Sequence, residues 1–80
     1  MITVKQSRDK DGEHFEQATL TFNDSLEAVA HLAKVELGWG GQIVDVSENH
    51  IKVQTRVLHC LDTSTFEGPA EEMKPLFELV

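Results

Sequence analysis

Cysteine is almost absent from this sequence, and so are long apolar runs. Cys60 is the only cysteine among 80 residues, so no internal disulfide can form and a reducing, cytoplasmic location is expected. No apolar run approaches the roughly 20 residues that a membrane-spanning helix needs. No apolar stretch follows a basic start at the amino terminus, as it would in a signal peptide. We therefore expect a cytoplasmic protein without a membrane partner.

Basic residues are scarce as well. Seven lysines and arginines face fourteen aspartates and glutamates, which gives a net charge of −7. Binding to nucleic acids or anionic membranes depends on basic side chains that meet phosphates, so the chain is a poor candidate for both. Residues 57–80 carry five carboxylates against Lys74 alone. These acids either bind a basic protein partner or only keep the chain soluble.

Side chains that carry chemistry are few and poorly spaced for a catalytic or metal site. The adjacent His59 and Cys60 fall in a predicted strand, so they should point to opposite faces and neither clamp one ion nor form a nucleophile–base pair. His14 and His50 lie near predicted hairpin ends, an arrangement that could bring two histidines together. We expect no catalytic residue, no metal and no cofactor, and hence a non-enzymatic protein.

The sequence does contain clear signals for strands and for one helix. Residues 2–6 and 15–22 alternate apolar and polar side chains on either side of Asp11-Gly12, a strong hairpin-turn signal. Residues 42–47 and 51–61 read as two further strands, and residues 62–65 as a loop. We predict a single α+β domain over residues 1–80. It should have an antiparallel sheet of about four strands (ββαββ) packed on one main helix, with a short C-terminal helix or strand.

The main helix is predicted over residues 24–37. Asp24 followed by Glu27 forms a capping-box pattern, with Asn23 as a rival cap, and Gly38 ends the helix. At roughly 100° per residue its apolar side chains form two stripes. The first stripe, expected to cover the sheet, is Leu26, Val29, Ala30, Ala33 and Leu37; the second is Ala28, Leu32 and Val35. Either the C-terminal segment covers the second stripe, or this stripe is a dimer or partner surface. The pattern places His31 on a polar arc and Glu36 toward water.

Trp39 and the C-terminal segment complete the set of candidate features. Trp39, the only tryptophan, lies among three glycines as either a lid on the core or an exposed anchor for a partner. Residues 68–74 read as a short helix with Pro69 in its first turn, ended by Pro75.

Two family resemblances follow from these residues. Residues 21–33, TFNDSLEAVAHLA, resemble the strand-to-helix junction of HicB-type antitoxins, which implies a homodimeric regulatory subunit. In length, acidic surplus, ββαββ pattern and lack of catalytic residues, the chain resembles small acidic inhibitors made by phages, the anti-CRISPR proteins among them. This second resemblance implies binding to a basic surface of a nucleic-acid-processing protein in the host cytoplasm.

The sequence therefore predicts a protein-binding inhibitor, monomeric or homodimeric, that meets a basic protein partner and no nucleic acid. The predicted partner-binding residues are Asp62, Glu67, Glu71, Glu72, Glu78 and Trp39. The candidate dimer face of the antitoxin-like alternative is Ala28, Leu32 and Val35.

Overall fold

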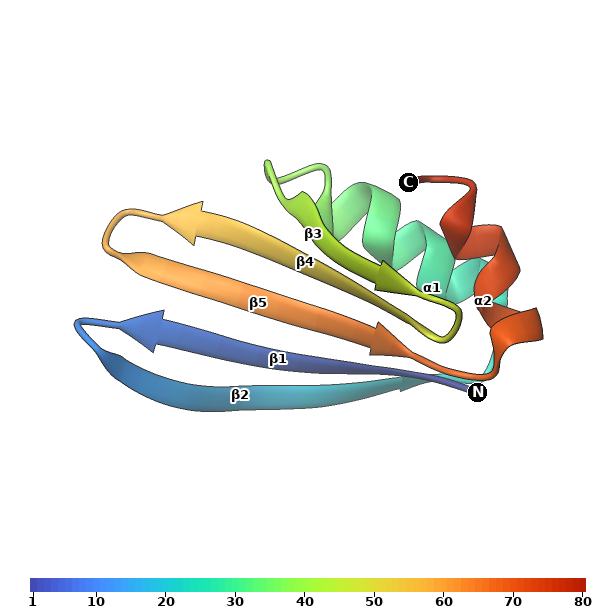
Figure 1. Cartoon of the computed structure of the whole chain (residues 1–80), viewed down its shortest axis with the longest axis horizontal. Helices are drawn as coiled ribbons and strands as arrows, with labels where there is room; N and C mark the ends of the chain where they lie inside the picture. Colours follow the sequence, from blue (N-terminus) through green and yellow to red (C-terminus); the bar gives the residue numbers. More distant parts are fainter.

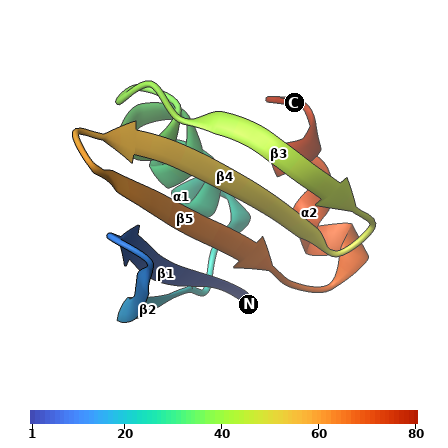
Figure 2. The ribbon, with the colours of Figure 1, turned by 60° about the vertical axis from the view of Figure 1, so that its left-hand side comes forward.

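The computed structural model describes all 80 residues and shows an α+β fold with a five-stranded antiparallel sheet (Figure 1). The sheet order is β2-β1-β5-β4-β3. Helices cover one face of the sheet, and the other face is open (Figure 2). In chain order the elements are β1 (Ile2–Lys10), β2 (Glu13–Phe22), α1 (Ser25–Ala30), the π-helical η1 (His31–Glu36), β3 (Gln42–Ser47), β4 (His50–Val57), β5 (Cys60–Glu67) and α2 (Ala70–Phe77).

The predicted hairpin at Asp11-Gly12 is confirmed. Both turn residues have positive φ, 52° at Asp11 and 81° at Gly12, and β1 pairs with β2 on either side of them. A two-residue loop with two positive φ angles matches the twist of the flanking strands, and the pair Asp-Gly supplies it at little steric cost.

The predicted count of four strands is wrong, because residues 51–61 form two strands and not one. Leu58 adopts a φ of 55° in the turn between β4 and β5. A leucine rarely takes this conformation, so its sequence carries no turn signal. Residues 62–65, predicted as a loop, lie inside β5, which pairs with both β1 and β4. His59 is consequently in the turn and not beside Cys60 in a strand.

The main helix begins as predicted, since the Asp24 side chain accepts a hydrogen bond from the Leu26 amide at 2.9 Å. Its second half is π-helical, and the Leu37 amide donates to the Leu32 carbonyl, five residues back, at 2.9 Å. A π-helical turn takes more residues than an α-helical turn, so successive side chains rotate by less than 100° about the axis. At 100° per residue Glu36 would lie about 80° from Ala28, whereas here both face the core side.

The predicted assignment of the two apolar stripes is therefore only partly right, since Val29 and Leu37 of the first stripe do pack against the core. Leu26, placed in the first stripe, is 71% exposed, whereas Ala28 and Leu32 of the second stripe are fully buried. The C-terminal helix α2 packs against α1, so this segment covers the second stripe, as one of the two alternatives predicted. Ala28 and Leu32 are thus part of the core and form no dimer face; only Val35 of that set is exposed.

The core lies between one half of the sheet and the helices. Its fully buried side chains are Ile2, Val4, Ala28, Leu32, Ile51, Val53, Phe66, Met73 and Leu76. Pro75 does not end α2 as predicted, since the helix continues to Phe77, and burial of Leu76 holds this last turn against the core. The strands extend well beyond the helices at the end opposite the chain termini (Figure 1). No helix reaches the length and hydrophobicity that crossing a bilayer requires.

Candidate functional site

The helix-side face of the sheet carries a groove where the strands run past the end of the main helix. Its volume is about 280 Å³. Val35, Glu36 and Trp39 line it from the helix end, and residues of β1, β2, β4 and β5 line it from the sheet. We call this cavity the groove.

Glu36 is the central polar residue of the groove. It is only 8% exposed, and the Ser64 hydroxyl donates to its Oε1 at 2.9 Å. The His31 Nε2 lies 3.2 Å from the same oxygen. The sequence pattern predicts that His31 and Glu36 face water, whereas both are largely buried here. The π-helical turns direct Glu36 inward, and Ser64 supplies the hydrogen-bond donor that a buried carboxylate needs.

Two aromatic side chains pack near the His31 ring. Its ring centroid lies 5.3 Å from that of Phe22 and 5.8 Å from that of Phe66. Ser64 and His31 both contact Glu36 and not each other, so the imidazole has no hydroxyl to activate. This cluster orients the carboxylate and is not a nucleophile–base pair.

Trp39 stands at the rim of the groove and is 80% exposed. Of its two predicted roles, the lid on the core is wrong and the exposed position is confirmed. The following Gly41 allows the chain to turn back closely against the helix: its amide donates to the Glu36 carbonyl at 2.9 Å. A Cβ at Gly41 would lie 2.5 Å from that carbonyl oxygen and 2.8 Å from Val53 Cγ1, so this return requires glycine.

Asp62, which also lines the groove, forms a two-pronged ion pair with Arg8 between β5 and β1. Arg8 Nε donates to Asp62 Oδ1 at 2.7 Å and Arg8 Nη2 donates to Asp62 Oδ2 at 2.9 Å. The hydrogen bond from Asp62, followed by its charge, raises the pKa of Arg8. Both carboxylate oxygens of Asp62 are thereby occupied, so this predicted partner-binding residue is paired within the chain.

The predicted partner-binding residues do not form one surface. Asp62 belongs to the half of the sheet that extends beyond the helices, and Glu67 Oε2 lies 3.5 Å from Lys5 Nζ on the open face. Glu72 is paired with the amino-terminal ammonium group. Glu71 and Glu78 are exposed on α2.

Carboxylates do gather where the two helices begin. The Ser25 hydroxyl donates to the Glu72 carbonyl at 3.0 Å, which ties the start of α1 to the first turn of α2. This region, with the rest of α2 and its C-cap Glu78, carries five carboxylates against Lys74 and the amino-terminal ammonium group. We call it the acidic end: Asp24, Glu27, Glu71, Glu72 and Glu78. Trp39 follows the other end of the main helix, so the length of α1 and η1 separates it from the start of α1 in the acidic end.

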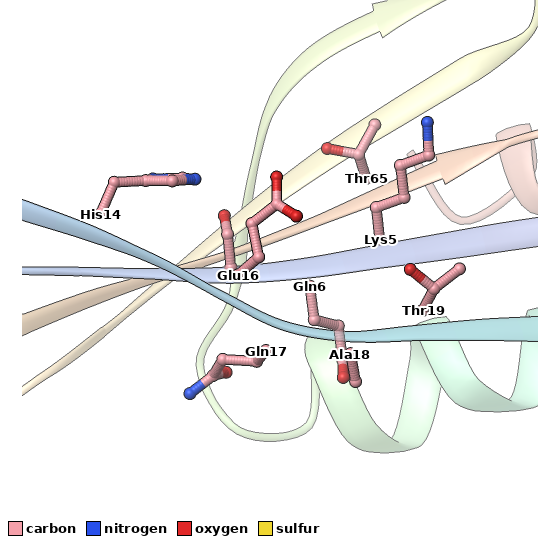
Figure 3. Close-up of a pocket in the computed structure, with 9 residues that line it drawn as sticks. Lys5, Gln6, His14, Glu16, Gln17, Ala18, Thr19 and Thr65 are labelled. Atoms are coloured by element: carbon pink, nitrogen blue, oxygen red, sulfur yellow. The ribbon is translucent and has the colours of Figure 1, made fainter.

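A second cavity of about 590 Å³ lies over β1 and β2, where the register shifts between Gln6 and Ser7. Figure 3 shows Lys5, His14 and Glu16 rising from one side of the sheet and Gln6 and Gln17 extending to the other. Because these side chains diverge, the cavity is a break in strand pairing and does not present converging groups to one ligand.

One hydrogen-bonded chain was missed by sequence reasoning. Ser47 Oγ lies 2.7 Å from His50 Nδ1, and His50 Nε2 lies 2.9 Å from Asp45 Oδ2. The hydrogen bond to His50 lowers the pKa of Asp45. The Ser47 hydroxyl also donates to Asn49 Oδ1 at 3.1 Å, so its single proton is engaged within the β3–β4 turn. The spacing of the three residues around a hairpin turn is the signal that could have found this network.

The histidines do not converge. His14 lies 2.7 Å from Asp9 near the β1–β2 turn, whereas His50 lies at the opposite end of the sheet, so the predicted approach of these two is wrong. No three His, Cys, Asp or Glu side chains meet in a geometry that could hold a metal ion.

Comparison with protein-family models, with curated proteins and with solved structures finds no match for this chain. The candidate sites are therefore the groove around Glu36 and Trp39 and the acidic end, both argued from geometry.

Proposed function

We propose that this protein is a non-enzymatic interaction module that binds a basic surface of a nucleic-acid-processing protein and inhibits it. The observation that carries the proposal is the uneven distribution of charge over the fold. Five of the fourteen carboxylates belong to the acidic end, around the starts of the two helices and along α2, with one lysine among them.

Such a surface attracts lysines and arginines of a partner and speeds their encounter. A basic groove that normally holds nucleic acid is the kind of partner surface it fits, since that groove is already adapted to negative charge. If the acidic end occupies the partner's basic nucleic-acid-binding surface, it excludes the nucleic acid and so inhibits the partner.

A competing explanation assigns these carboxylates to the stability of the helices. Acidic side chains in a first helical turn interact favourably with the helix dipole, by about 0.3–1 kcal/mol each. Glu27 in α1 and Glu71 and Glu72 in α2 occupy such positions. Glu78, at the C-terminal end of α2, does not, and a stability role leaves it unexplained.

The test is charge reversal at the acidic end. We expect the Glu71→Lys/Glu78→Lys variant to fold but to lose capture of a basic, nucleic-acid-binding protein from a lysate of the cells that naturally contain it. The matched control is Glu13→Lys/Glu16→Lys, which makes the same charge change with two exposed residues of β2. The captured protein should lose nucleic-acid binding when wild type is added and keep it with the variant. Equal capture by wild type and by the α2 variant refutes the proposal.

A further inference from the structure

We propose that the groove binds the side chain of an arginine presented by a protein partner. This site is separate from the acidic end, so the proposal goes beyond the one above, and the two can fail independently.

The charge of the groove favours a cation. Its lining includes two carboxylates, Glu36 and Asp62, and no lysine, arginine or histidine. Asp62 is neutralised by Arg8. Glu36 is different: Ser64 and His31 both contact its Oε1, while its Oε2 accepts no hydrogen bond from the protein. Every fully buried side-chain oxygen of the protein has a hydrogen-bond partner. Because Glu36 Oε2 has none, it is not fully buried, and we infer that it faces the groove that Glu36 lines.

A carboxylate with little exposure binds a cation more strongly than a surface carboxylate does, because less water screens the pair. Glu36 is also held in place, since two residues fix the orientation of its other oxygen. A ligand that brings its own positive charge and N–H donors therefore satisfies the oxygen that the fold leaves free.

The shape of the groove favours arginine among the cations. A volume of about 280 Å³ lies just below the range of about 300–1,000 Å³ typical of sites for whole small molecules, and it suits one long side chain. Trp39 at the rim offers an aromatic face on which a flat guanidinium stacks. Val35 and Val57, each a little under half exposed, offer apolar contact to the methylene stem. Gln6 and Gln17 add side-chain carbonyl acceptors for the remaining N–H groups.

The fluorescence of Trp39 reports on this site without any label. It is the only tryptophan and the chain has no tyrosine, so the signal comes from the rim of the groove. The probe is a blocked tripeptide, acetyl-Gly-Arg-Gly-amide, added to the full-length protein. The matched peptides carry lysine, or citrulline, which has nearly the shape of arginine but no charge. We expect a saturable change in fluorescence with arginine, a weaker response with lysine and none with citrulline.

Variants then assign the binding to the groove. We expect Glu36→Gln to weaken arginine-peptide binding by about ten- to a hundredfold, the range for a hydrogen bond to a charged group. The matched control, Glu48→Gln, removes the same charge at an exposed residue of the β3–β4 turn, outside both the groove and the acidic end, and should leave the affinity unchanged. Trp39→Ala removes the fluorescent reporter, so its affinity for the arginine peptide is measured by calorimetry. We expect binding to weaken by about two- to fivefold through loss of the stacking contact.

Three results would overturn the proposal. One is an equal response to the arginine and citrulline peptides. This comparison uses only the wild-type protein, so it remains valid even if Glu36→Gln does not fold. Another is unchanged affinity in both Glu36→Gln and Trp39→Ala. The third is a change in Trp39 fluorescence with protein concentration in the absence of peptide, which would assign the groove to a second copy of this chain.

Discussion

Leu58 offers a quantitative test of how the fifth strand is made. Its φ of 55° lies in the left-handed region, and its side chain is 89% exposed, so it contributes strain and almost no packing. The left-handed conformation costs an ordinary residue roughly 1–2 kcal/mol, and asparagine tolerates it far better. We therefore expect Leu58→Asn to raise the free energy of unfolding by about 1 kcal/mol. For a domain of this size that corresponds to a rise in Tm of about 4–8 °C.

Thermal unfolding followed by circular dichroism measures this change. The control is His59→Asn, which introduces the same side chain at the neighbouring turn residue, where φ is not positive, and should leave Tm nearly unchanged. An unchanged or lower Tm in Leu58→Asn, or an equal rise of Tm in His59→Asn, would refute this explanation. Backbone strain at Leu58 would then not be the source of a free-energy cost in the β4–β5 turn. The expected increase would show that this turn is formed because tertiary pairing of β5 compensates an unfavourable local conformation.

Two further predictions concern the helix and the β3–β4 turn. Leu32→Ala should lower the free energy of unfolding by about 2–5 kcal/mol, because it opens a cavity in the core. Leu26→Ala, at an exposed residue of the same helix, should change it by less than about 0.5 kcal/mol. Urea denaturation of the two variants measures both values, and similar losses would contradict the observed helix orientation. At the turn, the hydrogen bond to His50 holds the pKa of Asp45 below its ordinary value of 3.8. A carboxyl whose pKa is lower in the folded state stabilises the protein above the unfolded-state pKa, and the contribution is lost as the pH falls through the folded-state pKa. Wild type should thus be more stable than His50→Asn at about pH 6, and the difference should narrow at about pH 3; a difference that stays constant between these two values would argue against the Asp45–His50 contact.

The sequence predicts well wherever the structural signal is local. Asp11-Gly12 and the Asp24 cap act on their own neighbouring backbone groups, so their residue types alone identify a hairpin turn and a helix start. Leu58 shows the opposite case. Nothing in its side chain favours a turn, and its conformation follows from the pairing of β5 with strands on both sides.

The candidate site was only partly visible in the sequence. The groove requires Glu36 to face the sheet, and this depends on π-helical turns that the 3.6-residue period of the apolar pattern does not reveal. It also requires Ser64 of β5, which lies 28 residues further along the chain, to supply a hydrogen bond. The sequence predicts Trp39 as a partner-binding residue, but its glycine neighbours do not decide whether the side chain is covered or exposed.

The α+β class, the first hairpin, the start of the main helix and the excess of negative charge all follow from composition or from residues adjacent in the chain. The side of the helix that meets the sheet, the number of strands and the set of unpaired carboxylates are visible only once the chain is folded. Those properties depend on contacts between residues far apart in sequence, whose relative positions no local pattern specifies.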